Sequence, residues 1–210
     1  MRLLHQALNI ALEGQADGKA QIEKEHDFYA ILTDWSELSK AARCESQEQW
    51  LLKVEKPNKG AVRIRETREN LDGPPVYVFA VKLKGDGREV ETASTRDQFE
   101  AFMHLSDNGQ VKDRYFFPVA GTDRIFEVDC FLTEEAQEAR RKGYQVKGPI
   151  YHEWVKIDFE VLNLKTPIPA FPFATSRVIM EPFGHRNPED EKIVANLYKN
   201  VWKAINPFKK

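Results

Sequence analysis

Segments in which charged and apolar residues alternate one by one occur through most of this sequence. The clearest of them reads Lys156-Ile-Asp-Phe-Glu160, where three charged residues are separated by apolar ones. Successive side chains of a β-strand point to opposite faces of its sheet, so this spacing predicts a strand with one charged and one apolar face. A chain built from such strands forms a sheet whose two faces lie in very different surroundings.

The alternation, and the Gly, Pro, Asn and Asp residues that interrupt it, predict a chain made mainly of strands. We expect strands near residues 21–31, 50–56, 61–68, 76–84, 88–94, 110–118, 124–131, 151–162 and 175–181. We expect helices over residues 2–13, 34–43, 96–106, 133–142 and 188–205. The fold class is therefore α+β and mainly β, with an N-terminal helix and loop over residues 1–20 and a single domain over residues 21–210.

Several predicted strands carry charges of one sign on one face. These residues are Glu23, Glu25 and Asp27; Arg63 and Arg65; Lys82 and Lys84; Lys112 and Arg114; and Glu127 and Asp129. For any single strand, exposure of one sheet face to solvent is enough to explain its charged face. Because helices must also pack on the apolar faces, the whole set fits a closed antiparallel barrel of eight or nine strands with helices outside as well as it fits a solvated face, and the resemblance given below favours the barrel. The barrel would enclose a hydrophilic tunnel with a basic wall and an acidic wall.

The charges of such a tunnel predict its ligand. Clustered Arg and Lys side chains repel one another unless a polyanion neutralises them. Carboxylates that face them favour a hard divalent cation, Mg²⁺ or Mn²⁺, which prefers oxygen ligands and binds phosphates jointly with carboxylates. A nucleoside triphosphate or inorganic tripolyphosphate with its metal satisfies both walls.

The charge balance and the cysteine content exclude other partners. Lys and Arg number 31 against 33 Asp and Glu, a net charge of −2, whereas a broad nucleic-acid surface is normally basic. No segment approaches the roughly 20 apolar residues that span a membrane, so no membrane partner is expected. Two cysteines, Cys44 and Cys130, and no secretory pattern at the start predict a cytoplasmic location.

The charged segments also resemble the motifs of a known family, in the family's order. They are Glu23-Lys-Glu25-His-Asp27-Phe28, Val62-Arg63-Ile-Arg65, Phe79-Ala-Val-Lys82-Leu-Lys84-Gly85, Lys112-Asp-Arg114-Tyr115 with Phe126-Glu127-Val-Asp129-Cys-Phe131, and Lys156-Ile-Asp158-Phe-Glu160. Together they resemble the CYTH superfamily, the triphosphate tunnel metalloenzymes. The first is similar to the Glu-x-Glu-x-Lys-Phe signature of that family, except that Asp27 stands in the position of the lysine.

The resemblance implies roles for individual residues. Phosphate binding falls to Arg63, Arg65, Lys82, Lys84, Lys112, Arg114 and Lys156, to which we add Arg177 on a predicted strand of its own. Metal binding falls to Glu23, Glu25, Asp129, Asp158 and Glu160, and catalysis to Glu23, Glu25 and Glu160. Glu127 fits a metal ligand or a cross-strand partner of a basic residue equally well. Arg68, Arg88, Glu89 and Glu91 are expected to be surface charges.

The resemblance implies a metal-dependent hydrolase of a nucleoside triphosphate, tripolyphosphate or thiamine triphosphate. Two alternatives stay open. An adenylyl cyclase of the class IV type belongs to the same superfamily and would release pyrophosphate. A non-catalytic protein that binds or sequesters a phosphorylated ligand is suggested by Asp27 in the lysine position of the signature.

Overall fold

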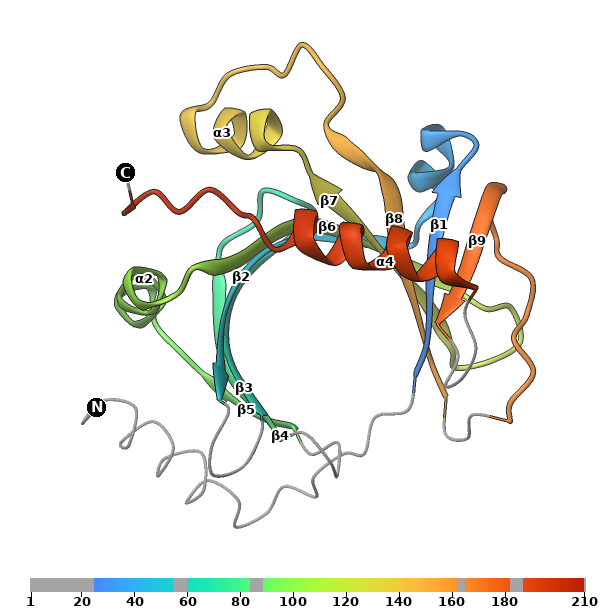
Figure 1. The fold of residues 1–210 in the computed structure, drawn as a ribbon, viewed down its shortest axis with the longest axis horizontal. Helices are drawn as coiled ribbons and strands as arrows, with labels where there is room; N and C mark the ends of the chain where they lie inside the picture. Colours follow the sequence, from blue (N-terminus) through green and yellow to red (C-terminus); the bar gives the residue numbers. More distant parts are fainter. Residues whose placement is uncertain (1–24, 55–59, 84–88, 162–164, 182–186, 210) are drawn as a thin grey trace.

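A computed structural model describes residues 25–54, 60–83, 89–161, 165–181 and 187–209 of the chain (Figure 1). The expected N-terminal helix over residues 2–13 lies outside the described residues, as do the predicted site residues Glu23 and Lys84.

Nine strands, one 3-10 helix and three α-helices make up the described part of the fold. The strands are β1 (Glu25–Leu32), β2 (Arg43–Val54), β3 (Gly60–Glu69), β4 (Val76–Leu83), β5 (Glu89–Ala93), β6 (Asn108–Pro118), β7 (Ile125–Leu132), β8 (Tyr151–Glu160) and β9 (Thr175–Glu181). The helices are η2 (Trp35–Lys40), α2 (Arg96–Leu105), α3 (Glu134–Lys142) and α4 (Pro188–Val201). Within the described residues, no helix is long and apolar enough to cross a membrane.

All nine strands form one antiparallel sheet in the order β5-β4-β3-β2-β6-β7-β8-β1-β9. The sheet curls into an arch (Figure 1). It does not close, because in the described part of the chain β5 and β9 pair with one neighbour each. The expected closed barrel is therefore wrong. β5 has only five residues, and alternation along a strand specifies its two faces without specifying whether the outermost strands meet.

The hydrophobic core lies on the convex side of the arch. Phe126, Val128 and Cys130 of β7 and Val155, Ile157 and Phe159 of β8 point to this side and are almost completely buried. Figure 1 shows α2 and α3 outside the arch, and Phe99, Phe102 and Met103 of α2 pack on Trp50 of β2. Burial of each such large side chain contributes about 2–3 kcal/mol. The apolar faces of β2 and β3 therefore lie under α2, as the sequence predicts, whereas those of β7 and β8 lie under Leu38 of η2 and under Phe171 and Phe173. The charged faces point into the arch.

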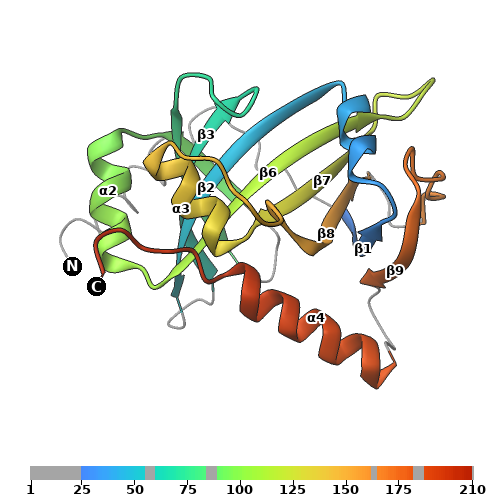
Figure 2. The same ribbon diagram turned by 90° about the horizontal axis from the view of Figure 1, so that it is seen from above.

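Helix α4 is placed differently from the other two. It lies across one end of the arch, from β9 toward β6 (Figures 1 and 2). Its Val194 is buried against Tyr29 of β1 and Ile179 of β9, both on the concave side of the sheet. The helix begins where the sequence predicts, with Asn187 as its cap and Pro188 in its first turn.

The largest local difference from the sequence prediction concerns residues 34–49. A helix is expected over residues 34–43, but the chain forms only the short η2 and then enters β2 at Arg43. The outward-facing residues of this first half of β2 include Ser46 and Glu48, and the inward-facing ones include Gln47 and Gln49. Because both faces are polar here, the strand has no charged-apolar alternation to reveal it.

Candidate functional site

A cavity of about 810 Å³ lies on the concave face of the sheet. Its charged lining residues are Glu25, Arg63, Arg65, Lys82, Glu89, Glu91, Lys112, Arg114, Glu127, Asp129, Lys156, Asp158 and Glu160. Its uncharged lining residues are Tyr29, Gln49, Gln110, Phe131, Tyr198, Val201 and Trp202. The cavity therefore brings together side chains from eight strands, β1 to β8, and from the end of α4.

Most of the predicted site residues meet in this cavity. Six of the eight predicted phosphate-binding residues line it: Arg63, Arg65, Lys82, Lys112, Arg114 and Lys156. Of the predicted metal ligands, Glu25, Asp129, Asp158 and Glu160 line it as well. The strand pairing explains the convergence, because each of these residues lies on the inward-facing side of its strand.

Arg177 is not among the residues that line the cavity. Its guanidinium group lies 3.1 Å from Asp190 and 3.6 Å from Glu189, both in the first turn of α4. The same group lies over the ring of Trp154, at 5.8 Å from the ring centroid. Arg177 therefore connects β9 to the start of α4.

A network of ion pairs joins β6 and β7 at the floor of the cavity. Arg114 binds Asp129 with Nε at 2.6 Å and Nη2 at 2.9 Å, and it also pairs with Glu127. Lys112 pairs with Asp129 as well. Burial, assisted by the Arg114 charge, lowers the pKa of Lys112 to about 8 although Asp129 opposes the change. Burial would raise the pKa of Asp129, but Arg114 and Lys112 together hold it well below its ordinary value. Asp129 is therefore an ionised partner of two cations.

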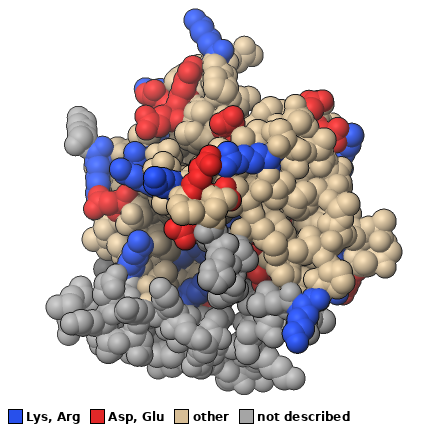
Figure 3. Space-filling view, turned by 45° about the vertical axis from the view of Figure 1, so that its right-hand side comes forward, with Lys and Arg blue, Asp and Glu red and all other residues tan. Residues whose placement is uncertain are grey.

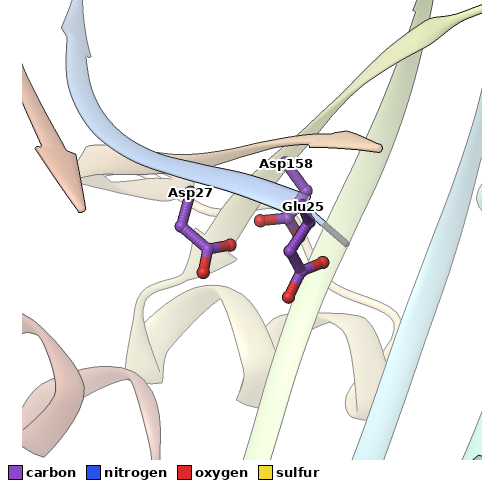
Figure 4. Close-up of side chains that lie close together, drawn as sticks. All are labelled: Glu25, Asp27 and Asp158. Carbon is purple, nitrogen blue, oxygen red and sulfur yellow. The ribbon is translucent and has the colours of Figure 1, made fainter. Parts of the chain in front are cut away.

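A second group of carboxylates lies where β1 pairs with β8. Glu25, Asp27 and Asp158 each place an oxygen within 4.8 Å of the others (Figure 4). Asp27 and Asp158 are opposite each other in the strand pairing. We call Glu25, Asp27 and Asp158 the carboxylate triad. Like charges in such positions destabilise a sheet unless a cation lies between them.

The protein itself supplies two cations to the triad: Arg114, whose Nη2 lies 3.4 Å from Asp158 Oδ2, and Lys156. The Lys156 ammonium nitrogen lies 2.8 Å from Asp27 Oδ1 and 2.6 Å from Asp158 Oδ1. Burial raises the pKa of Asp158 to about 6, with further contributions from the Asp129 charge and a hydrogen bond with Asp27, although Lys156 opposes the change. Lys156 and Arg114 therefore only partly neutralise the triad.

The cations of β3 face carboxylates of the edge strand β5. Arg63 Nη2 lies 2.5 Å from Glu89 and 3.1 Å from Glu91, and Arg65 Nη2 lies 3.4 Å from Glu91. Glu89 and Glu91 both line the cavity, so the expectation of a surface charge is wrong for Glu89, whereas the Glu91 side chain is 44% exposed. Both residues lie on the inward-facing side of β5, opposite Lys82 and Ala80. Cross-strand pairing with arginine accounts for their position.

The cavity does not have the predicted basic and acidic walls. Cations and carboxylates instead pair with each other between strands, because a buried charge is tolerated when an opposite charge accompanies it. Among the described lining residues, six side chains are basic and seven are acidic. Basic and acidic groups are also interspersed on the outer surface in the view of Figure 3. The site is therefore highly charged without being basic.

Some of these residues were missed by the sequence interpretation. Asp27 belongs to the carboxylate triad. The sequence places it on the charged strand face with Glu25 but gives it no ligand role. Gln49 lies just before the predicted strand 50–56, in a stretch with no predicted element, so its strand face could not be assigned. Gln110 lies on the same strand face as Lys112 and Arg114, which is a usable signal, but its side chain is uncharged.

Comparisons with known proteins find solved structures of similar shape but do not assign the chain to a family. No family model matches the chain, and no curated protein matches it. A hypothetical protein of known crystal structure is similar over 79% of this chain and 94% of its own, with 17% identity and a TM-score of 0.43. A protein from Pyrococcus horikoshii is similar over 85% of this chain and 90% of its own, with 14% identity and a TM-score of 0.42. A protein from Vibrio parahaemolyticus that is provisionally described as an adenylate cyclase covers 70% of this chain and 80% of its own, with 11% identity and a TM-score of 0.38.

Likeness of this degree carries no functional assignment. The function is therefore argued from the cavity itself.

Proposed function

We propose that the protein binds a triphosphate-containing ligand together with Mg²⁺ or Mn²⁺ in the concave cavity and hydrolyses it. The observation that carries the proposal is the convergence of six basic side chains and seven carboxylates, Glu25 and Asp158 of the triad among them, on one cavity of about 810 Å³. Arginine and lysine are the usual partners of phosphate oxygens, arginine by forked contacts and lysine as a point charge. A ligand with several phosphate groups is one that can engage many of them at once.

The charge balance of the cavity supports a requirement for a divalent cation. With six basic and seven acidic side chains lining it in the described part of the chain, the cavity has no excess of positive charge. A bare polyphosphate would place its own negative charges among these carboxylates. A ligand that carries a divalent cation brings compensating charge, so metal and phosphate are expected to bind jointly.

The residues of the carboxylate triad fit the proposed metal. They offer hard oxygen ligands, which Mg²⁺ and Mn²⁺ prefer. Asp158 is buried, with 5% of its surface exposed, and Lys156 lies 2.6 Å from its Oδ1, so a cation already occupies this position. Glu25, Asp27 and Asp158 would hold the ion. When bound, it would neutralise the phosphates and polarise their oxygens.

The protein's own residues have distinct parts in this proposal. Arg65, Lys82 and Lys112 would hold the phosphate chain and stabilise the charge that moves to the leaving group, since phosphoryl transfer depends mainly on positioning and electrostatics. Glu160 lines the cavity opposite Glu25 in the β1–β8 pairing. It is the carboxylate proposed to orient a water molecule and accept its proton. Arg114 and Asp129 bind each other and keep the cavity floor in place.

A second function is favoured by Lys156. Its ammonium group contacts two of the three triad carboxylates, where a metal ion would bind. A protein that keeps this contact would bind a phosphorylated ligand without metal and without turnover. Hydrolysis requires that the metal and the ligand phosphates draw Lys156 away from the triad.

One assay separates these functions. Purified protein is incubated with tripolyphosphate, ATP or thiamine triphosphate, with Mg²⁺, with Mn²⁺ and with EDTA, and orthophosphate, pyrophosphate and cyclic AMP are measured. We expect metal-dependent release of orthophosphate, and we expect Glu160→Gln to reduce it strongly. Cyclic AMP with pyrophosphate would identify a cyclase instead. Tight binding without any product would support the non-catalytic binding function. The absence of both binding and product would contradict the proposal.

A further inference from the structure

The edge strand β5 places two carboxylates against three basic residues of the cavity. Glu89 lies 2.5 Å from Arg63 Nη2 and 3.7 Å from the Lys82 ammonium nitrogen. Glu91 lies 3.1 Å from Arg63 and 3.4 Å from Arg65. Half of the six basic residues that line the cavity are therefore engaged by two residues of one short strand.

The contact between Glu89 and Arg63 is the firmest of these. It has the shortest distance, and it is a hydrogen bond as well as an ion pair. The Glu89 side chain is 11% exposed, compared with 44% for Glu91. In the described part of the chain, Glu89 is therefore the closest partner of Arg63.

Glu89 and Arg63 lie across the arch from the carboxylate triad. Strands β3, β4 and β5 belong to one arm of the arch, and β1 and β8 belong to the other (Figure 1). A ligand whose metal is held by the triad must therefore extend across the cavity to reach Arg63. At that point it meets the Glu89 carboxylate, which already occupies the guanidinium group.

Exchange of Glu89 for a phosphate group depends on how each anion is held. Glu89 is attached to the chain beside Arg63, so its effective concentration there is on the order of millimolar or higher. A free single anion must exceed that concentration to displace it. A phosphate group of a ligand that Arg65 and Lys112 already hold is tethered in the same way, so its effective concentration is comparable. Only a ligand with several phosphate groups therefore competes with Glu89 on equal terms.

We propose that Glu89 is a specificity residue that reserves Arg63 for ligands with several phosphate groups and excludes single phosphate ions. This rests on the function proposed above, since a polyphosphate must bind in the cavity. Without ligand, Glu89 pairs with Arg63, and a bound polyphosphate displaces it. The position of β5 permits the displacement, because this strand pairs with β4 alone in the described residues and its Glu91 already reaches solvent.

The test removes the charge of Glu89 and looks for a gain of binding, which mere damage to the fold would not produce. Dissociation constants are measured by calorimetry with Mg²⁺ for imidotriphosphate, an inorganic triphosphate that resists hydrolysis. We expect Glu89→Gln to bind it about three- to tenfold more tightly than the wild type, the effect of one competing charged contact. Orthophosphate, at a concentration that leaves the wild-type affinity unchanged, should reverse this gain.

A double-mutant cycle shows whether the gain acts through Arg63. In the Arg63→Gln background, the additional change Glu89→Gln should tighten binding less than about twofold. A gain that persists at full size there would reflect only the lower negative charge of the cavity, and it would overturn the proposal. Glu100→Gln makes the same change in a pair with Arg96 on α2, outside the cavity, and should leave the affinity unchanged.

A second variant keeps the outcomes distinct. Glu91→Gln changes the more exposed of the two carboxylates and should give a smaller gain in the same direction. If neither variant binds imidotriphosphate more tightly than the wild type, or if orthophosphate weakens all three proteins equally, Glu89 does not guard Arg63, although the proposed function stands. If imidotriphosphate binds to none of these proteins, the proposed function itself fails.

Discussion

At the scale of single residues, Arg65 is the arginine of the cavity with the most unused bonding capacity. Arg114 meets Asp129, Glu127 and Asp158, whereas in the described part of the chain Arg65 is paired with Glu91 alone, at 3.4 Å. Its Nε is buried without a hydrogen-bond partner. Burial, followed by the nearby Arg63 charge, lowers the pKa of Arg65. An anion that reaches Arg65 would therefore gain a charge-assisted bond without breaking a strong one.

Replacement of Arg65 should accordingly abolish most of the phosphate binding. We expect Arg65→Ala to weaken tripolyphosphate binding about 10- to 100-fold, since a hydrogen bond to a charged group contributes about 1.5–3 kcal/mol. Arg96→Ala removes an exposed arginine that pairs with Glu100 on α2, and it should leave the affinity unchanged. Calorimetric titration of both variants makes the comparison. Equal losses in the two would remove Arg65 from the phosphate site.

Asp158 makes stability depend on pH in a direction opposite to that of most carboxylates. Its pKa is raised from 3.8 to about 6, so the folded protein binds this proton more tightly than the unfolded chain does. Its stabilising contribution is present below pH 4 and is lost as the pH rises to 6. Asp158→Asn cannot ionise and should gain stability relative to the wild type over this interval, by about 1–3 kcal/mol. Melting temperatures of both proteins at pH 4 to 8 test this, and a difference that is constant with pH would contradict it.

At the scale of elements, the strands were predictable where one of their faces is charged and the other apolar. β3, β4, β7 and β8 appear near their expected positions with the expected face inward. The first half of β2 was not predictable, because the residues on both of its faces are polar. The position of α4 was not predictable either. The apolar residues Val194 and Leu197 predict that one side of α4 is buried, but they do not predict against which surface. That surface, around Tyr29 and Ile179, is formed by two strands that are distant in sequence.

The attachment of α4 gives the third prediction. Arg177→Gln removes the ion pairs that join β9 to Glu189 and Asp190. Because the Arg177 side chain is 40% exposed, we expect a loss of unfolding free energy below about 1 kcal/mol. Tripolyphosphate affinity should stay within twofold of the wild type, since Arg177 does not line the cavity. A tenfold loss of affinity with unchanged stability would return Arg177 to the phosphate-binding group.

At the scale of the whole molecule, the fold places its core outside the arch and its charges inside. Strand alternation together with the motif resemblance was enough to predict this arrangement and most of the residues that meet in the cavity. It could not predict that β5 and β9 stay apart or that Glu89 and Glu91 turn inward, since both depend on how distant strands come together. The resulting balance of six basic and seven acidic lining residues, among those described, makes a divalent cation central to the account.

The most direct measurement is therefore the affinity for tripolyphosphate with and without Mg²⁺, made by calorimetry on the wild-type protein and on Asp27→Asn. The account predicts that the wild type binds tripolyphosphate at least ten times more tightly with Mg²⁺ than with EDTA. Asp27→Asn, which removes one carboxylate charge from the triad, should lose most of that difference. Wild-type binding that is equally tight in EDTA, or no binding in either condition, would contradict the account.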